Sequence, residues 1–534
     1  MNASARTGVA AVSVFALGVG VNLYFGRRGF LPLDQSIVFD GGWRVLSGQV
    51  PFRDFMAPGA ITPSVMQAPF FALFGVTWFA LVFHASVING LACVATYAFL
   101  RLCGSTKFEA TLFGALTAFF FYPPIGTPFT DQHAFFFTLL MLLAVVAGTV
   151  VSGRRGWMAW FAVPLLFALA FFSCQIPTAF AALCVAVWVV VNWGRAGQWL
   201  SALVAGTLAL AAILVIFAWT YHVDPRVVWT YIVAMPLGTG ANRTPASSAF
   251  APVRLILGTY RRLPGWAGMW SIDLAAAAPF ILVAAFRVRP FPRLLFWSST
   301  TVLFVTVGFV AYSNTPLPAG LGLTMLMAGL STVALREMIV GVAGNVGRRR
   351  VVAVVVAAVA AAAALLDTAT FIRTTDMPRM PHAKYDAAAD QRARGHLPAA
   401  LSFMGWSRGA SHYEPDEMAE LVNYLRGAGG NFLLIGDSSV LYGLTGRPSV
   451  SQVLWFDPGL SMPLPGTPGF VPFEDELVRR VGADDVRRVV LEGPRTWTRL
   501  SLADIPKLKH LTESRGCGER RFGNVRVIEM CPPS

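Results

Sequence analysis

The stretch LPLDQSIVFDGGWRVLSGQVPFRDFMAPG, residues 31–59, places three carboxylates directly after a long apolar run. The carboxylates belong to Asp34, Asp40 and Asp54, and the stretch also holds Arg44 and Arg53. Charged side chains beside a bilayer are costly unless they face water or serve a function. The stretch is therefore either a solvated connection between membrane spans or a reaction centre at the membrane surface.

The composition of the whole chain is that of a membrane protein. Of 534 residues, 55% are hydrophobic and 13% are charged, whereas soluble domains carry about 25% charged residues. A spanning helix needs about 20 mainly apolar residues, and this criterion predicts about eleven spans. The first is expected to be an uncleaved anchor, because no cleavage-site pattern follows it. The predicted spans are roughly 7–26, 77–100, 107–122, 131–152, 157–174, 176–193, 200–222, 271–286, 293–313, 317–336 and 350–368.

The charge pattern indicates how the chain crosses the membrane. Lysine and arginine number 42 against 28 acidic residues, a formal net charge of +14. Most arginines of the first 350 residues lie in alternate loops, while the intervening loops YPPIGTPFTDQ and SCQIPT contain no Lys or Arg. Positive charge is enriched in cytoplasmic loops, so the alternation predicts a cytoplasmic N-terminus. It also explains the basic balance without a nucleic-acid partner.

Residues 369–534 differ in character from residues 1–368, and we expect them to form a separate extracytoplasmic α/β domain. Residues 414–430, EPDEMAELVNYLRGAGG, contain a helix start and a glycine-rich stop. NFLLIGD and VRRVVLEG are typical of short buried strands. A terminal hairpin flanked by Cys517 and Cys531 would allow a disulfide outside the cytoplasm. The turn LLIGDSS superficially resembles a nucleotide-binding or hydrolase turn, but the chain contains no G-x-S-x-G, G-x-G-x-x-G or P-loop motif.

Part of the opening stretch has helical periodicity. Four apolar residues recur at helical spacing, and Asp40 and Arg44 occupy the other face; the apolar residues are Ile37, Val38, Val45 and Leu46. This pattern predicts a short amphipathic helix along the membrane interface, followed by the apolar segment ITPSVMQAPFFALFG. Asp40 and Asp54 are interpreted as structural, with Asp54 pairing with Arg53 or capping the next segment.

The same stretch resembles the first outer loop of bacterial GT-C glycosyltransferases, the protein-mannosyltransferase-like membrane enzymes that take sugars from polyprenyl-phosphate carriers. In that family an acidic residue precedes the glycine of a Leu-Leu-x-Gly-x-x-Pro-Tyr-x-Asp segment by about fourteen residues. Asp34 stands in this relation to Gly48 of VLSGQVPFRDF, with Pro58 and ALFG following. Gln35 stands where many relatives carry a second acid, and Phe52 replaces the tyrosine.

The resemblance implies a polytopic helical bundle with its active site on the outer face of a bacterial inner (plasma) membrane. Asp34 is then the general base. Asp131, in TPFTDQHAFFF, is the second outer-loop acid, although it also suits a helix N-cap. Arginines in the loop 222–268 suit phosphate binding because guanidinium offers a planar fork, with contact to lipid headgroups as the alternative. The predicted substrate- and phosphate-binding residues are Arg53, His133, Arg243, Tyr260, Arg261 and Arg262.

The resemblance implies a glycosyltransferase that moves a hexose or pentose from a polyprenyl-phosphate donor to a glycan, lipid or protein acceptor of the cell envelope. Its expected partners are the lipid-linked donor, the acceptor and membrane lipids. A divalent metal is left open, because Gln35 replaces an acid and no Cys/His cluster occurs. The alternatives are a transporter or flippase for a lipid-linked glycan and a non-catalytic assembly scaffold. A transporter would carry charges or broken helices at mid-membrane, and the predicted spans carry almost none.

Overall fold

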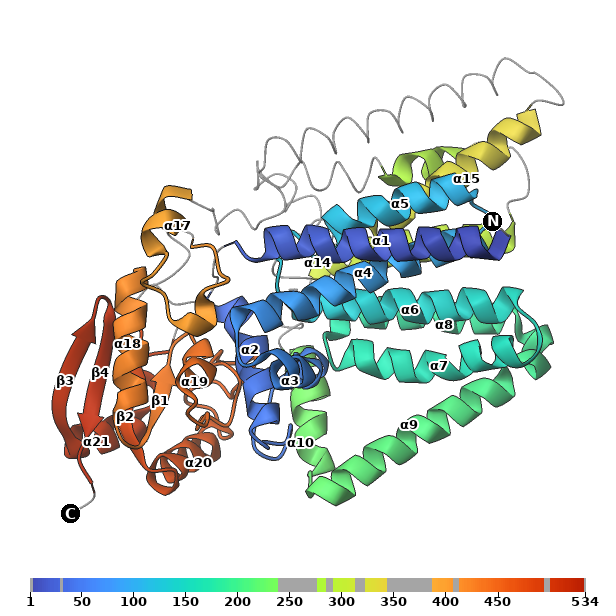
Figure 1. Cartoon of the computed structure of the whole chain (residues 1–534). Coiled ribbons are helices and arrows are strands. Elements are labelled where there is room, and N and C mark those ends of the chain that lie inside the picture. Colours follow the sequence, from blue (N-terminus) through green and yellow to red (C-terminus); the bar gives the residue numbers. More distant parts are fainter. Residues whose placement is uncertain are drawn as a thin grey trace.

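A bundle of long helices stands at one end of the molecule and a helix-covered sheet at the other, as the computed structural model shows (Figure 1). Two short helices, α2 (Pro32–Leu46) and α3 (Ile61–Phe74), lie between them. The mainly helical class with a small C-terminal α/β part is thereby confirmed. The structure describes residues 3–28, 32–238, 276–284, 292–312, 322–342, 387–406, 413–493 and 500–532.

The bundle is made of apolar helices that correspond to predicted spans. Within the described ranges, four helices are long and apolar enough to cross a membrane: Gly8–Gly26, Trp78–Leu102, Thr130–Val150 and Leu200–Tyr221. The predicted span 350–368 lies outside the described residues. The bundle helices are α1 (Ala3–Gly26), α4 (Trp78–Leu102), α5 (Lys107–Phe120), α6 (Thr130–Val150), α7 (Gly153–Phe171), α8 (Gln175–Val191), α9 (Leu200–Tyr221), α14 (Arg293–Tyr312) and α15 (Thr324–Val342), and residues 276–284 are also helical.

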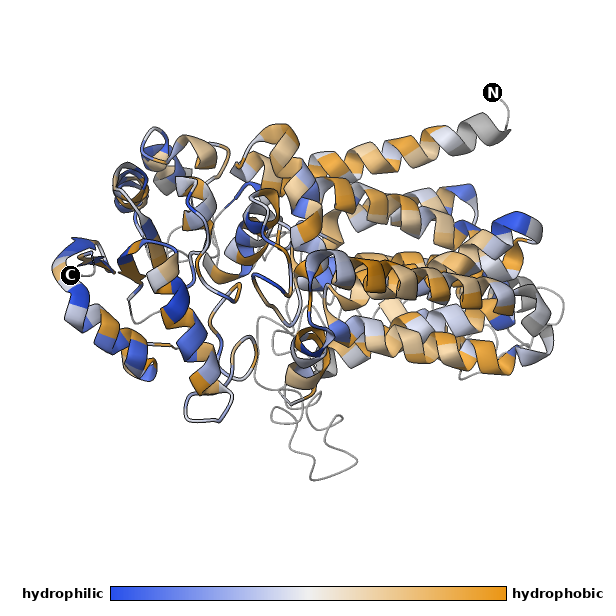
Figure 2. Cartoon of the chain, turned by 90° about the horizontal axis from the view of Figure 1, so that it is seen from below, coloured by the Kyte–Doolittle hydropathy of each residue, from blue (hydrophilic) through white to orange (hydrophobic). Residues whose placement is uncertain are grey.

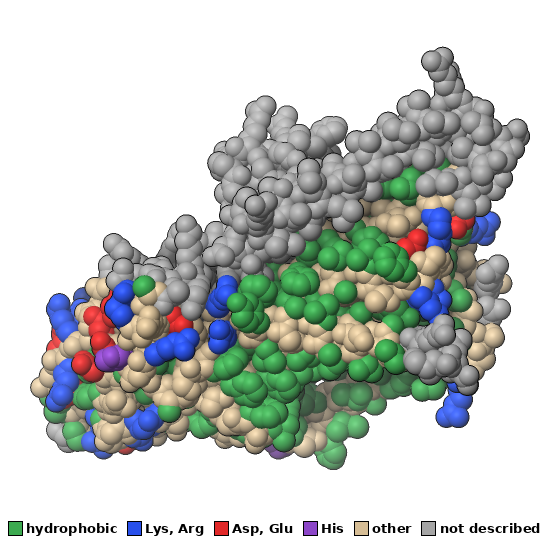
Figure 3. Space-filling view, turned by 45° about the horizontal axis from the view of Figure 1, so that its top comes forward, with side chains coloured by type: hydrophobic (Ala, Val, Ile, Leu, Met, Phe, Trp, Pro, Cys, Tyr) green, Lys and Arg blue, Asp and Glu red, His purple; other side chains and the backbone are tan. Residues whose placement is uncertain are grey.

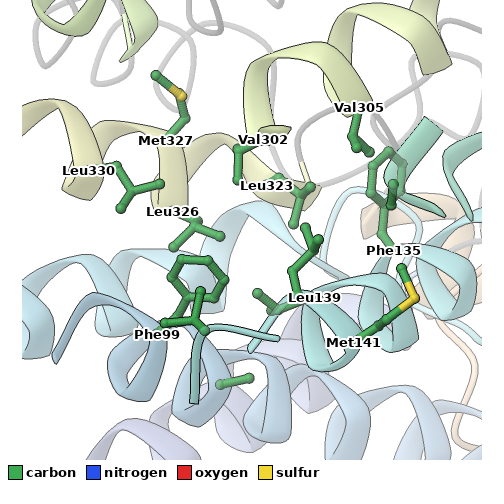
Figure 4. Close-up of a cluster of buried hydrophobic side chains, with 14 of the residues drawn as sticks. Phe99, Phe135, Leu139, Met141, Val302, Val305, Leu323, Leu326, Met327 and Leu330 are labelled. Carbon is green, nitrogen blue, oxygen red and sulfur yellow. The ribbon is translucent and has the colours of Figure 1, made fainter. Parts of the chain in front are cut away.

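The bundle helices pack through close contacts at small residues and through a core of bulky hydrophobic side chains. Gly18 of α1 approaches α4 so closely that a Cβ on it would lie 2.7 Å from the Gly90 Cα, a contact that small residues permit between membrane helices. In the buried core, Leu326 of α15 faces Phe99 of α4, and Val305 of α14 lies beside Phe135 of α6 (Figure 4). The late helices thus complete a core that the early helices begin.

The surface divides along the long axis of the molecule. The bundle helices are largely hydrophobic, whereas the C-terminal part is mixed (Figure 2). Hydrophobic side chains cover the outside of the bundle, and charged side chains gather over the C-terminal part and at the far end of the bundle (Figure 3). Helices that satisfy their own backbone groups behind an apolar surface are what a bilayer requires. The chain is therefore a multi-pass membrane protein.

The C-terminal α/β region, residues 387–532, is built on a four-stranded sheet in the order β1-β2-β4-β3. β1 (Asn431–Ile435) and β2 (Val486–Leu491) are parallel, while β4 (Val525–Met530) runs antiparallel to β2 and forms a hairpin with β3 (Gly516–Phe522). A disulfide joins Cys517 to Cys531. The helices of the region are α17 (Ala387–Ala393), α18 (Pro415–Gly427), α19 (Val440–Thr445), α20 (Phe470–Ala483) and α21 (Pro506–Arg515). The predicted boundary at 368/369 lies outside the described residues.

The charged face of α2 is buried against the C-terminal region. Asp40 is 0% and Arg44 is 1% exposed. The amphipathic pattern predicted that this face is open to water, and that prediction is wrong. Arg44 Nε donates to Asp40 Oδ2 at 2.8 Å, and Arg44 Nη1 donates to the Ser451 carbonyl at 2.6 Å. The Ser449 hydroxyl donates to Asp40 Oδ1 at 2.5 Å. The periodicity predicted the helix and its two faces, but it did not show that protein covers the polar one.

Backbone hydrogen bonds join the first outer loop to the same region. Met56 N–H donates to the Gln452 carbonyl at 2.8 Å, and Leu454 N–H donates back to the Met56 carbonyl at 3.3 Å. The predicted pairing of Asp54 with Arg53 is confirmed, with an N–O distance of 2.7 Å. The loop is therefore a structured bridge between the bundle and the sheet.

Breaking the buried pair should loosen this bridge. Asp40→Asn leaves the Arg44 charge buried without its carboxylate, and we expect it to lower the free energy of unfolding by about 3–5 kcal/mol. The double variant Asp40→Leu/Arg44→Met removes both charges and should cost less. Denaturant unfolding in detergent, followed by tryptophan fluorescence, measures both. Arg487→Met, at an exposed pair with Asp485, serves as the near-neutral control; equal losses in all three variants would contradict the assignment.

Candidate active site

Asp34 lies in the first turn of α2 and is partly exposed. A helix N-terminus by itself favours an ionised carboxylate. The pKa of Asp34 is nevertheless raised to about 7, because burial removes water from the carboxyl group and because Asp131 and Asp437 add nearby negative charge. Three carboxylates from distant parts of the sequence therefore share one electrostatic environment, and such perturbed groups are concentrated at functional sites.

Asp131 occupies the first turn of α6 and is 8% exposed. Cys174 and Thr130 are the polar neighbours of its carboxylate. Cys174 comes from the turn between α7 and α8, so Asp131 stands where three helix ends meet. The N-cap of α6 is Phe129 and no side chain caps the helix, so the capping alternative is wrong. The electrostatic coupling of Asp131 to Asp34 fits the site prediction.

The loop 121–129 connects the two acids structurally. Asn89 Oδ1 accepts the Tyr122 N–H at 3.1 Å and thereby ties the loop to α4. On the other side, Gln35 Nε2 donates to the Ile125 carbonyl at 3.5 Å. The residue that stands in place of a second acid therefore binds the loop that leads into α6. An amide donates this hydrogen bond, which a carboxylate cannot do.

His133 lies deeper, in a chain of buried polar groups inside the bundle. His133 Nδ1 lies 2.5 Å from the Tyr122 hydroxyl, and His133 Nε2 lies 3.1 Å from His84 Nε2. The other nitrogen of His84 lies 2.9 Å from Gln67 Oε1. All four side chains are buried. They join α3, α4 and α6 next to the loop that precedes Asp131, so His133 stabilises the helices that hold this loop. Its predicted phosphate contact stays a prediction.

A cavity of about 460 Å³ opens beside Asp131. Its wall includes Thr130, the α7–α8 turn with Cys174, the π-helical segment Thr230–Ala234 and Trp455 from the C-terminal region. Most of the lining is apolar, and its few polar side chains include Thr130, Ser173 and Gln175. A concave apolar site with a few polar groups at one place is typical of ligand pockets.

The backbone at the edge of this cavity is unusual. Ala60, directly after the lining residue Gly59, is buried and has a φ of 65°, a left-handed conformation that costs a non-glycine residue energy. Its N–H donates to the Ser173 carbonyl at 3.0 Å, and the Ile61 N–H donates to the Phe172 carbonyl at 3.1 Å. These contacts hold the end of the first outer loop against the α7–α8 turn.

Asp437 is the site residue that the sequence did not reveal. It lies in the turn after β1, it is 1% exposed, and its charge reaches Asp34 across the interface between α2 and the C-terminal region. The signal was the turn LLIGDSS, whose resemblance to ligand-binding turns lacked a complete motif. Asp437 was not predictable from this turn alone, because its link to Asp34 arises from the packing of the C-terminal region on α2.

The other predicted binding residues are placed as follows. Arg53 lies in the first outer loop with its guanidinium on Asp54, at 2.9 and 2.7 Å. Arg243, Tyr260, Arg261 and Arg262 lie outside the described residues. Phosphate binding by these five residues stays a prediction.

The described parts of the chain contain no set of side chains arranged to bind a metal ion. There, no three His, Cys, Asp or Glu side chains are grouped as metal ligands. The three coupled aspartates are not close enough together to form such a set.

Comparison with known proteins shows which solved structures have a similar fold. No family model and no curated protein match the sequence. Among solved structures, ArnT from Cupriavidus metallidurans bound to undecaprenyl phosphate is similar over 99% of this chain and 98% of its own, with a TM-score of 0.52 at 13% identity. The chain has the ArnT fold.

The apo state of ArnT is similar over the same shares, with a TM-score of 0.50 at 13% identity. The archaeal oligosaccharyltransferase AglB from Archaeoglobus fulgidus is similar over 96% of this chain and 74% of its own, with a TM-score of 0.42 at 13% identity. The predicted resemblance to GT-C membrane glycosyltransferases is confirmed at the level of the fold. The ArnT likeness spans both the bundle and the C-terminal region.

The buried histidine chain generates a test. His133→Phe removes the partner of Tyr122 and His84 at similar volume, and buried polar groups left without partners cost about 1–3 kcal/mol. We expect the free energy of unfolding to fall by that amount, with any change in donor KM secondary. Denaturant unfolding measures it, with exposed His510→Gln as the control. Unchanged stability with a raised donor KM would instead support the phosphate-contact prediction.

Proposed function

We propose that this protein is a membrane glycosyltransferase that transfers a sugar from a polyprenyl-phosphate donor to a hydroxyl of a cell-envelope acceptor. The observation that carries the proposal is the electrostatic coupling of Asp34 to Asp131, whose neighbour Thr130 lines an apolar cavity, within an ArnT-like fold. The acceptor is a glycan, a lipid or a protein, and the sugar is a hexose or a pentose.

Asp34 acts as the general base in this proposal. The acceptor oxygen forms a bond to the anomeric carbon while Asp34 takes the hydroxyl proton. The bond between the anomeric carbon and the phosphate oxygen breaks, and its electron pair leaves with the polyprenyl phosphate. A carboxylate with a pKa near neutrality suits this role, because it is ionised at working pH and still basic enough to accept the proton.

The cavity suits the lipid part of the donor. Its apolar wall, with Phe171, Ile176 and Phe180 among the lining residues, offers the environment that isoprenyl units seek. Thr130, one of its few polar lining residues, directly precedes Asp131, so a lipid whose phosphate lies at Thr130 would present it near the acids. ArnT has been captured with undecaprenyl phosphate bound, which supports the choice of this carrier class.

The arrangement of charges supports a site on the outer face of a bacterial inner (plasma) membrane, with the N-terminus cytoplasmic. Gly405 N–H donates to the Arg27 carbonyl at 2.7 Å, which ties the end of α1 to the C-terminal region. α1 therefore begins at the opposite end of the bundle (Figure 1). That end carries Arg101, Lys107 and Arg336, as the positive-inside rule expects for the cytoplasm. The Cys517–Cys531 disulfide suits the opposite, oxidising side.

Transfer by the purified protein in liposomes tests the function. A panel of polyprenyl-phosphate sugars is supplied, and released polyprenyl phosphate is measured. We expect Asp34→Asn to lower the rate about 10²–10⁴-fold, the usual contribution of a general base, and Asp131→Asn to lower it less. Asp224→Asn, at an exposed helix cap that Asn also serves, is the matched control. A fully active Asp34→Asn would refute the base assignment, and no release from any donor would favour a transporter or scaffold.

The pH dependence follows from the same carboxylate. Because the pKa of Asp34 is raised to about 7, Asp34 is protonated below that pH and is not able to accept the acceptor proton. The kcat/KM should rise as the pH rises through about 7, and one unit below the midpoint it should be down about tenfold. A steady-state profile from pH 5 to 9 measures this. A flat profile between pH 5 and 8 would be inconsistent with Asp34 as the base.

A further inference from the structure

The turn after β1 lies at the edge of the C-terminal sheet where the parallel strands β1 and β2 end. β1 and β2 are parallel and end together, with Ile435 opposite Leu491. Ligands of α/β sheets bind in the crevice at the carboxyl ends of parallel strands. Asp437 lies two positions after the end of β1, and Glu492 directly follows β2. Two acids therefore stand at this edge.

Glu492 fixes the backbone of the turn. Its Oε2 accepts the N–H groups of Asp437 and Ser438, the latter at 3.2 Å, and its Oε1 accepts the Tyr413 hydroxyl. A Cβ on Gly436 would collide with the Glu492 carboxylate, so the turn needs glycine at this position. The location of Asp437 is thus set by contacts within the C-terminal region.

The packing of α19 on α2 carries this turn to Asp34. Gly443 of α19 lies against α2, where a Cβ on it would be 2.7 Å from Phe39 Cε1. One turn further along both segments, Trp43 Nε1 donates to the Arg447 carbonyl at 2.9 Å. Between these two contacts the segments run in the same direction, so the start of α19 lies toward the start of α2. Asp437 lies three residues before α19, and Asp34 lies in the first turn of α2.

We propose that Asp437, buried in the C-terminal region where α19 packs on α2, is a positioning residue of the transferase site that acts through Asp34. The inference rests on the proposed function, in which Asp34 is the general base. The electrostatic coupling between Asp437 and Asp34 does not itself require transfer activity. The electrostatics agree with the geometry, because Asp437 contributes to the raised pKa of Asp34. The C-terminal region then takes part in the chemistry and is more than an acceptor-binding appendage.

Few other ionisable groups face Asp34 among the described elements that pack on α2. α3 carries none. The loop 121–129 and the start of α6 present Tyr122 and Asp131, and α19 presents Tyr442, whose hydroxyl accepts the Leu434 N–H at 2.9 Å. On α2 itself, Asp40 and Arg44 neutralise each other. Asp131 and Asp437 are therefore the charges that act on Asp34.

Carbodiimide labelling of Asp34, followed by mass spectrometry, measures its protonation in the intact protein at each pH. We expect a midpoint near pH 7 in the wild type and a midpoint lower by about half a pH unit or more in Asp437→Asn, because a like charge has been removed. Where transfer is observed, the acid limb of kcat/KM should move by the same amount. Asp484→Asn, an exposed aspartate of the same region, should leave the midpoint unchanged.

A midpoint in Asp437→Asn equal to that of the wild type overturns the proposal. If this variant does not fold, Asp437→Ser removes the same charge with a smaller side chain, and an unchanged midpoint there is equally decisive. A purely structural role for Asp437 would lower stability without moving the titration of Asp34. A shifted midpoint in a protein that transfers no sugar would uphold the coupling and refute the proposed function.

Discussion

The buried ion pair between Asp40 and Arg44 is the interaction on which the arrangement of the site depends. Two opposite charges without access to water are costly unless each finds hydrogen bonds beyond the pair. Those extra bonds come from Ser449 and the Ser451 carbonyl, both in the C-terminal region. The polar face of α2 is thus satisfied only when this region is docked on it, and the same docking brings the charge of Asp437 to bear on Asp34. Fold and site are coupled through one polar contact.

The acids of the site are held by elements that converge from three parts of the chain. Asp34 starts α2, Asp131 starts α6 and Asp437 follows β1. Like charges placed together without a metal raise each other's affinity for protons, and such an arrangement costs stability. It becomes useful when one carboxylate must hold a proton near neutral pH. The apolar cavity beside Asp131 supplies the complementary feature, a place for a lipid next to the charges.

The sequence predicted the helical elements and the outer-loop acids because both follow from local patterns. The spans appear as apolar runs, α18 as a capped amphipathic segment, and Asp34 through its spacing from Gly48. The partner of the charged face of α2 was not predictable, since periodicity shows which residues share a face but not what covers it. Asp437 was missed for the same reason. It joins the site through the packing of α19 on α2, and these two helices are about 400 residues apart in the chain. The roles of Arg243, Tyr260, Arg261 and Arg262 stay predictions, since they lie outside the described residues.

The most direct test of the central claim is a cryo-electron microscopy structure of the full chain in a lipid nanodisc with polyprenyl phosphate. The account predicts isoprenyl density in the cavity between α8 and the Thr230–Ala234 segment. It also predicts that the phosphate lies at the N-terminal ends of α2 and α6, close enough for an acceptor hydroxyl bound at Asp34 to reach the sugar that the phosphate carries. Lipid bound at another place with this cavity empty, or Asp34 and Asp131 too far apart for one substrate to meet both, would contradict it.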